Sequence, residues 1–384
     1  MIIQPTWKNN PDINRLFELF TAHRFQLFIV GGWIRDCVLN IPAHDLDLAT
    51  DATPNQILKM ITPYGLKHNS NFSQYGTVLL GADNISVTTF REDINPQGRQ
   101  TDVKFSKNLE TDANRRDFTI NALYATYEGR IIDPLNGLDD LINGRVKFIG
   151  HPYDRISEDY LRVLRFFRFT AAYGNANNGF DPDGLSAVKR TDIQKLRTLS
   201  PERVRHEVLR LVTVRPLYWC LKSIEKTPIW SWLFPQGNSQ NINRLEKIEK
   251  EYGLNSPTIL NLAILGVQPY NPIYALTRSE SQYLEIMRNL LNSRQKIDEI
   301  AYRHGVDLAK DFHLVQAVLS NKAIATDFIA RITLAAKQTF PITSSDLSRQ
   351  YKGEKLGQTL KEIEQTWIDS QFTLKKEELL DKYL

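Results

Sequence analysis

The chain has 384 residues, of which 42% are apolar and 24% charged, a composition that is typical of a folded protein and excludes a disordered one. Its net charge of +4 permits an anionic partner but is too small to indicate one by itself. The sequence contains no run of about eighteen apolar residues, which argues against a membrane span, and its two cysteines have no metal-ligand or disulfide spacing, so we expect a reducing, cytoplasmic location.

The first predicted element is an apolar strand at residues 25–30, followed by a double glycine that includes Gly32, a short helix with Arg35, and a second strand with Asp45 and Asp47. Glycine lets the backbone approach a phosphate closely, and arginine binds phosphate oxygens with two donors. Residues i and i+2 of a strand point the same way, so the two aspartates would offer paired oxygen ligands that suit Mg²⁺. Each part alone also occurs in ordinary turns and strand edges. Together they favour metal-dependent nucleotidyl transfer.

Short strand and helix signals alternate through the rest of the first 150 residues. Residues 92–99 carry Pro96 and Gly98 among charged residues and predict a mobile loop. Strands are predicted at 78–80, 85–90, 103–105 and 130–133, with a polar turn at 81–84 between the first two, and helices at 55–61 and 115–123.

Helix-period patterns replace the strand signals from about residue 154 to the end. One continuous helix is predicted over 156–173, closed by Gly174, and another over 201–214, with Ser200 as its cap. Further helices are predicted at 242–252, 279–291, 294–304, 308–319 and 356–368. The fold class is therefore α+β, with an α/β head over 1–150, an all-helical neck over 151–215 and an all-helical body and tail over 216–384.

Two adjacent arginines, Arg115 and Arg116, begin the helix predicted at 115–123, where the helix dipole disfavours positive charge. A structural interpretation is a salt bridge to Asp112 or Asp117. A functional interpretation is that one arginine, with Arg116 preferred, binds a triphosphate or the nucleotide sugar. The residues leave both interpretations open.

Acidic and basic side chains meet on the helix predicted at 156–173, where Asp159 and Arg162 would lie side by side. They form either an ordinary ion pair on a solvated face or a carboxylate acceptor beside guanidinium donors. The second arrangement matches cytosine and adenine, which have an amino donor next to a ring-nitrogen acceptor. Uracil and guanine reverse both groups, and the mismatch would leave polar groups unpaired. We expect Arg165 and Arg168, farther round the helix, to hold phosphate or to brace the template that Asp159 and Arg162 form, rather than to touch the base.

The helix predicted at 201–214 carries Arg203 and Glu207 at i, i+4 spacing, which favours an ion pair between them. We expect this helix to brace the arginine-bearing one rather than to contact a substrate.

Five motifs follow one another within about residues 25–210: GGxxRD with DxD, RRDFT, DPxxGxxDL, EDxxRxxR and ERxxxE. In this order and spacing the chain resembles the class II tRNA nucleotidyltransferase and bacterial poly(A) polymerase family, and most of all the CCA-adding enzymes. The resemblance implies a nucleotidyltransferase head of the polymerase-β type, a neck that selects the nucleotide, and a body and tail that bind the tRNA acceptor stem. It also implies addition of C, C and A from CTP and ATP without a nucleic-acid template, with Mg²⁺ as cofactor.

The resemblance also assigns roles to individual residues. Those implied for the metal are Asp45 and Asp47; for the triphosphate, Gly32, Arg35 and Arg116; for base selection, Asp159 and Arg162; and for further nucleotide contacts, Arg165 and Arg168. The segment 91–99 resembles the flexible loop of enzymes that add the final A. His44 stands where the family more often has a basic residue, which bears on a phosphate contact there.

Three alternatives accompany this interpretation. The first is a poly(A) polymerase or an A-only enzyme on the same scaffold. The second is a non-catalytic RNA-binding module, against which the intact Asp45 and Asp47 speak. The third is a small-molecule nucleotidyltransferase of the antibiotic-modifying kind, which would leave the long helical half without an evident role.

Overall fold

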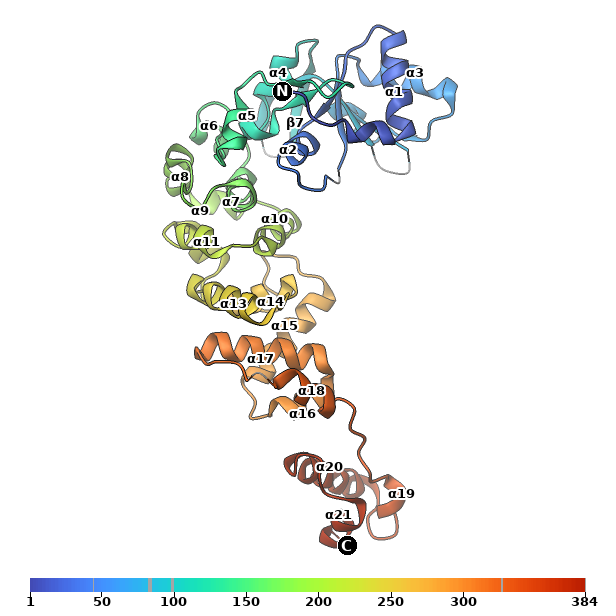
Figure 1. Ribbon diagram of the computed structural model, residues 1–384, viewed down its shortest axis with the longest axis vertical. Helices are drawn as coiled ribbons and strands as arrows, with labels where there is room; N and C mark the ends of the chain where they lie inside the picture. The colour runs from blue at the N-terminus through green and yellow to red at the C-terminus, as the bar shows by residue number, and fades with distance from the viewer. Residues whose placement is uncertain (44, 82–84, 98–99, 326, 384) are drawn as a thin grey trace. The chain divides into compact units, whose positions relative to one another are not determined.

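The computed structural model describes residues 1–43, 45–81, 85–97, 100–325 and 327–383. The chain divides into two compact units, one formed by 1–235 with 272–275 and the other by 236–271 with 276–384. Figure 1 shows a sheet with its helices in the blue-to-cyan part of the chain and helices alone beyond it. The α+β class predicted from the sequence is confirmed.

A mixed sheet forms the centre of the first unit, with strand order β3-β4-β5-β2-β1-β8-β9. β1 pairs antiparallel with β2, and β2 pairs parallel with β5, so that Asp47 lies between Val30 and Ser86 in the register. Apolar residues of the central strands are fully buried, which explains why these short runs form strands. The strands are β1 (Leu27–Val30), β2 (Asp47–Thr50), β3 (His68–Asn69), β4 (Thr77–Leu80), β5 (Ile85–Thr89), β8 (Tyr124–Ala125) and β9 (Ile131–Ile132).

A separate two-stranded ribbon is made by β6 (Arg91–Gln97) and β7 (Gln100–Phe105). The prediction of a mobile loop at 92–99 was therefore wrong for residues 92–97. The register shifts between Ile94 and Gln97, and this irregularity accommodates Pro96, which cannot donate to a regular ladder. Residues 98 and 99, the turn residues 82–84 and His44, with its questioned phosphate contact, lie outside the described residues.

The helices around the sheet are α1 (Pro11–Ala22), α2 (Gly32–Val38), α3 (Pro54–Ile61) and α4 (Leu109–Asn114). A capping box between Thr53 and Gln56 begins α3, close to where the sequence predicts a helix. The helix predicted at 115–123 was wrong, because only a short 3₁₀ turn, η4 (Thr119–Asn121), forms there. The amide of Thr119 bonds the Lys147 carbonyl instead, which keeps this backbone from continuing α4.

The continuous helix predicted at 156–173 is two helices, α6 (Pro152–Glu158) and α7 (Leu161–Tyr173). The chain turns between them at Asp159, whose φ of −149° and ψ of 107° are extended. The carboxylate of Asp159 accepts a hydrogen bond from the Leu161 amide at 3.0 Å, so it caps the beginning of α7. The local sequence is compatible with a helix throughout, and the break depends on this capping and on a distant ion pair described below.

Further helices complete the first unit: α5 (Gly137–Ile142), α8 (Pro182–Lys189), α9 (Ile193–Leu196), α10 (Pro201–Thr213), α11 (Tyr218–Ile224) and α12 (Pro228–Leu233). α10 packs against α7 and confirms the helix predicted at 201–214. A cluster of phenylalanines joins the sheet end to α7, with Phe118, Phe148 and Phe166 in mutual ring contact.

The second unit is helical over its described residues, and each helix predicted there is confirmed with shifted ends. Its helices are α13 (Ser239–Tyr252), α14 (Thr258–Ile264), α15 (Arg278–Leu291), α16 (Ile297–His304), α17 (Val306–Ser320), α18 (Phe328–Ala335), α19 (Ser344–Leu347), α20 (Gly353–Asp369) and α21 (Lys376–Tyr383). Trp367 and Ile363 of α20 centre an apolar cluster with Leu379. None of the described helices combines the length and apolar character needed to cross a bilayer.

Candidate active site

An acidic edge of the sheet carries the residues predicted to bind metal. Asp47 is the first residue of β2, and its neighbour across the ladder, Ser86, donates a hydrogen bond to its carboxylate. Partial desolvation raises the pKa of Asp47, the Ser86 hydrogen bond and the Arg116 charge oppose this, and the Asp45 charge adds to it. Asp45 lies outside the strand, so the prediction that one strand holds both aspartates was wrong. The electrostatic influence of Asp45 nevertheless places both acidic groups in one neighbourhood.

A glycine turn leads from β1 into α2 beside this edge. Gly31 has φ 74° and ψ −123°, a conformation that a side chain would strain. Its amide donates to the Leu123 carbonyl at 3.0 Å, which ties the turn to the residues before β8. A Cβ built on Gly31 would lie 3.6 Å from Nη1 of Arg116, so the turn and that guanidinium adjoin each other.

The Arg35 guanidinium is buried, with 7% exposure, and is shared by three elements. It donates from Nη1 to Oδ1 of Asn121 at 2.6 Å and from Nε to Asp36 at 3.0 Å. Its centre lies 4.0 Å from the ring centroid of Tyr173 on α7. The contact with Tyr173 makes Arg35 a brace between α2 and α7 as well as a neighbour of Gly32, whose Cβ position is 3.4 Å from its Nη2.

The arginine pair after α4 confirms the structural interpretation of its sequence. Arg115 and Arg116 both form ion pairs with Asp112, at 2.7 and 2.9 Å. Asp117, the other acidic partner considered, pairs with Arg165 instead. Nη1 of Arg116 approaches the Asn121 carbonyl at 3.4 Å, toward the glycine turn. The ion pair and a nucleotide-binding role are therefore compatible, since they engage different sides of Arg116.

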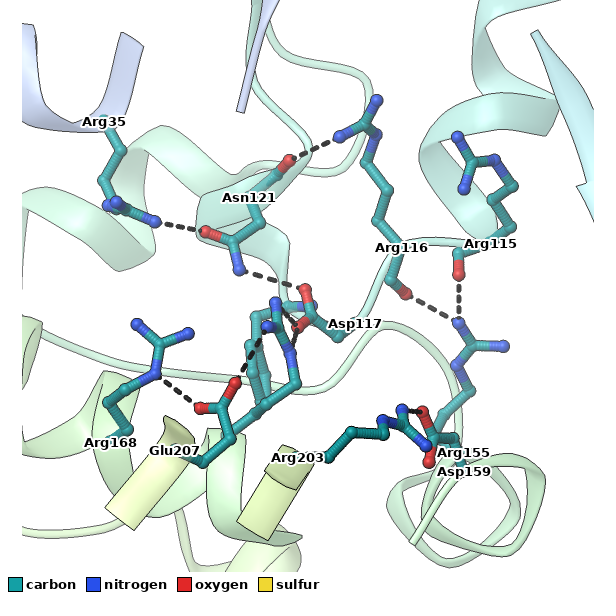
Figure 2. A network of polar contacts seen from close by, with 12 residues as sticks. Arg35, Arg115, Arg116, Asp117, Asn121, Arg155, Asp159, Arg168, Arg203 and Glu207 are labelled. Atoms are coloured by element: carbon teal, nitrogen blue, oxygen red, sulfur yellow. Dashed lines mark hydrogen bonds and ion pairs between the residues drawn. The ribbon is translucent and has the colours of Figure 1, made fainter. Parts of the chain in front are cut away.

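A chain of polar contacts runs from Arg35 to α10 (Figure 2). Asn121 donates to Asp117 at 2.9 Å, and Arg165 of α7 donates to the same carboxylate at 2.7 Å. Burial alone would raise the pKa of Asp117, but the Arg165 charge and the Asn121 hydrogen bond outweigh it and bring it to about 2. Arg165 thus connects α7 to the segment that carries the arginine pair.

The other end of this network of polar contacts is Glu207 of α10, which is 3% exposed. Arg168 donates to one of its oxygens at 2.6 Å, and Arg165 lies 3.5 Å from the other. The ion pair predicted between Arg203 and Glu207 was wrong, because each of them turns to a different partner outside α10. The prediction that α10 braces the arginine-bearing helix is confirmed by these contacts.

The corner between α6 and α7 holds the residues predicted to select the base, Asp159 and Arg162. They do not pair with each other through their side chains. Asp159 binds Arg203 of α10 at 2.7 Å, and Arg162 binds Glu158 and, at 2.7 Å, the Arg155 carbonyl. The prediction that they sit side by side on one helix was wrong, because Asp159 lies in the break. Both remain at the same corner, where the Arg162 amide donates to the Asp159 carbonyl at 3.0 Å.

Arg155 of α6 is a residue that the sequence interpretation missed. Its Nη2 donates to the carbonyl oxygens of both Arg115 and Arg116, at 2.6 Å each, as Figure 2 shows. Its Nη1 donates to Glu158 at 2.6 Å, and Glu158 in turn holds Arg162. The signal that could have found it is the spacing of three and four residues that places arginines on both sides of Glu158. Among the described residues, no group of three or more His, Cys, Asp or Glu is arranged to hold a metal.

Residues 27–147 match the poly A polymerase head domain family. The chain is 30% identical to the CCA-adding enzyme of Streptococcus gordonii, over 92% of each chain. It is 27% identical to the human mitochondrial CCA tRNA nucleotidyltransferase 1, over 96% of this chain and 88% of the relative. Its fold matches the Bacillus stearothermophilus CCA-adding enzyme in complex with CTP, with a TM-score of 0.76, 21% identity and coverage of 99% and 98% of the two chains. The chain belongs to the CCA-adding enzyme family of tRNA nucleotidyltransferases.

Proposed function

We propose that this chain adds C, C and A in turn to the 3′ end of tRNA, from CTP and ATP and without a nucleic-acid template. The observation that carries the proposal is the arrangement of three groups: the Arg116 guanidinium adjoins the Gly31 turn, and that turn directly follows Val30, the residue opposite Asp47 in the sheet. A carboxylate, close backbone approach and a fixed cation are the groups that a nucleoside triphosphate and its metal require.

In the proposed reaction the RNA 3′-hydroxyl attacks the α-phosphate, and the bond to the leaving pyrophosphate breaks. Asp45 and Asp47 fit Mg²⁺ because their carboxylate oxygens are the hard donors it prefers, and Ser86 orients one of the two groups. When bound there, Mg²⁺ would supply activation of the attacking oxygen and neutralisation of the leaving charge. Gly32, Arg35 and Arg116 would hold the triphosphate.

The base would be selected at the corner between α6 and α7. Asp159 would accept a hydrogen bond from the amino group of cytosine or adenine, and Arg162 would donate to the adjacent ring nitrogen. Arg203 supports this role because it holds Asp159 at 2.7 Å while a carboxylate keeps lone pairs for another donor. Arg165 and Arg168 would act mainly as braces, since Asp117 and Glu207 already engage them.

Residues 1–150 would serve as the catalytic head, 151–215 as the base-selecting neck, and 216–384 as the body and tail that hold the tRNA acceptor stem. Double-stranded RNA is usually bound through its backbone and shape, so we expect no base readout in the stem. Cys37 and Cys220 are free thiols, which fits the reducing cytoplasm that we propose as the location.

The test is addition of labelled nucleotides to tRNA that lacks its 3′ CCA, with CTP alone, ATP alone and both together. We expect C with CTP alone and completion to CCA only with both nucleotides. The name of the matching head family favours one second candidate, a poly(A) polymerase. Incorporation of A without C, or long A tails, would establish that candidate in place of ours.

A further inference from the structure

One buried carboxylate organises the arginine pair. Asp112 on α4 is buried, with 1% of its side chain exposed. Its Oδ1 accepts from Nε of Arg115 at 2.8 Å, and its Oδ2 accepts from Nη2 of Arg116 at 2.9 Å. The hydroxyl of Tyr124 donates to the same Oδ2 at 2.7 Å and accepts from Nε of Arg116 at 3.1 Å. A buried carboxylate is tolerated only with such complete pairing.

This pairing fixes the direction of Arg116. The Nε and Nη2 side of its guanidinium faces Asp112 and Tyr124, which leaves Nη1 toward the Asn121 carbonyl and the Gly31 turn. A guanidinium is planar and rigid, so fixing one edge fixes the other. Gly31 follows Val30, which lies opposite Asp47 in the sheet, so Nη1 of Arg116 adjoins the turn next to the strand end that carries Asp47.

The arginine pair also keeps an excess of positive charge. Two guanidinium groups share the single carboxylate of Asp112. A third arginine, Arg91 at the beginning of β6, lies within electrostatic reach of both; Asp93 pairs with it at 3.3 Å, and burial together with the Arg115 charge lowers its pKa to about 10. Three guanidinium groups thus share two carboxylates. A cluster of cations that repel one another in a partly buried place is stabilised by an added anion. This surplus is independent of the geometry of Arg116 and points to the same ligand.

We propose that Asp112, assisted by Tyr124, is the positioning residue of the triphosphate site: it holds Arg116 in the orientation that receives a nucleotide's phosphates. The inference rests on the proposed function and deepens it, because it names a group that acts through Arg116 rather than on the substrate. An asparagine at this position would keep the shape but replace an accepting oxygen with an N–H₂ group, which cannot accept from either arginine. Arg116 would then turn away from the glycine turn.

The experiment measures equilibrium binding of CTP, CMP and inorganic pyrophosphate, each with Mg²⁺, to the full chain. The variants are Asp112→Asn and Tyr124→Phe. The matched control is Asp140→Asn in the same unit, since Asp140 is also a buried carboxylate, 6% exposed, and pairs with Arg145 and Thr119. Thermal unfolding of every variant gives the loss of stability that accompanies each substitution.

We expect Asp112→Asn to weaken CTP and pyrophosphate binding at least tenfold while CMP binding stays within twofold. Tyr124→Phe, which removes one hydrogen-bonding hydroxyl and no charge, should weaken CTP binding two- to fivefold. Asp140→Asn should leave all three ligands within twofold despite its loss of stability. A purely structural role would not separate CTP from CMP.

Unchanged CTP binding by folded Asp112→Asn would overturn the inference, and so would equal losses of CTP and CMP in this variant and in the Asp140 control. If Asp112→Asn does not fold, Tyr124→Phe decides: a loss confined to CTP and pyrophosphate supports the inference, and unchanged binding overturns it. Failure of the wild-type chain to bind CTP at all would instead refute the proposed function, and the inference with it.

Discussion

The two ends of the proposed nucleotide site are built in different ways. At the phosphate end, two arginines that are 15% and 17% exposed share the Asp112 carboxylate, whose side chain is only 1% exposed. At the base end, Asp159 and Arg162 are held by Arg203 and Glu158, whose side chains are each 25% exposed. Ion pairs with access to water exchange partners at small cost, whereas breaking an enclosed pair is costly. CTP and ATP share their triphosphate but not their base, so a fixed phosphate end and an adjustable base end suit the two substrates.

If both ends serve one reaction centre, substitution of Asp47 should have the largest effect of all. Asp47→Ala should reduce nucleotide addition by at least about 10³-fold, because it removes one of the two carboxylates proposed to hold Mg²⁺. Binding of tRNA should stay within a few-fold of wild type. Gel assays of addition and filter binding of labelled tRNA measure the two quantities. Residual addition near the wild-type rate would show that the acidic edge is not the centre.

The phosphate end should respond to substitution without regard to the base. Arg116→Ala should lower kcat/KM for CTP and for ATP by the same factor, about 100-fold, since roughly 3 kcal/mol of charged hydrogen bonding is lost. Steady-state kinetics on tRNA that lacks its last two nucleotides, which accepts C, and on tRNA that lacks only its last nucleotide, which accepts A, separates the two substrates. A loss confined to one of them would remove the distinction between the ends.

The base end should respond in the opposite way. Arg162→Ala should reduce discrimination against UTP and GTP by about 10- to 30-fold, because a wrong base would no longer leave a buried donor unpaired. Affinity for the triphosphate should change less than discrimination does. Competition between CTP and UTP in one reaction measures the ratio directly. Weaker binding with unchanged selectivity would contradict the assigned role.

The smallest effect concerns the acid stability of the phosphate end, where a contribution that is present in full at neutral pH is lost at low pH. Burial would raise the pKa of Asp112, but Arg116 and Arg115 outweigh burial and hold it near 2, below its usual 3.8. A depressed carboxyl pKa adds stability above its unfolded value and loses it as pH falls, here between about 4 and 2. The contribution is about 2 kcal/mol. Urea unfolding of wild type and Asp112→Asn across this window should show a shallower acid slope in the variant.

Sequence patterns predicted the elements that depend on local chemistry and failed where distant partners decide. The helix α3 begins with a capping box that its own residues supply, and it was predicted nearly to the residue. The break at Asp159 is fixed by Arg203, 44 positions away, and local periodicity gives no sign of it. The 115–123 segment likewise follows a backbone bond to Lys147 rather than its own helix propensity.

The same distinction between local chemistry and distant partners applies to the residues of the candidate site. Motif spacing selected Asp47, Arg116, Asp159 and Arg162 because these residue types carry recognisable chemistry. It could not predict which residues form ion pairs with these side chains, since the pairs with Asp112, Glu158 and Arg203 depend on tertiary packing. The roles of the selected residues in metal, phosphate and base binding stay predictions until the variants are measured.

Arg155 has a consequence for how a mismatched nucleotide would be sensed. A single planar guanidinium grips two consecutive peptide carbonyls on one side and, on the other, the glutamate that anchors Arg162. Arg155 does this with two separate nitrogens, Nη1 toward Glu158 and Nη2 toward the two carbonyls, which the rigid guanidinium plane holds at a fixed distance from each other. An ill-fitting base would strain the corner between α6 and α7. Arg155 would convey that strain to the peptide units that carry Arg115 and Arg116. Poor base fit would therefore loosen the hold on the leaving group before a bond is made.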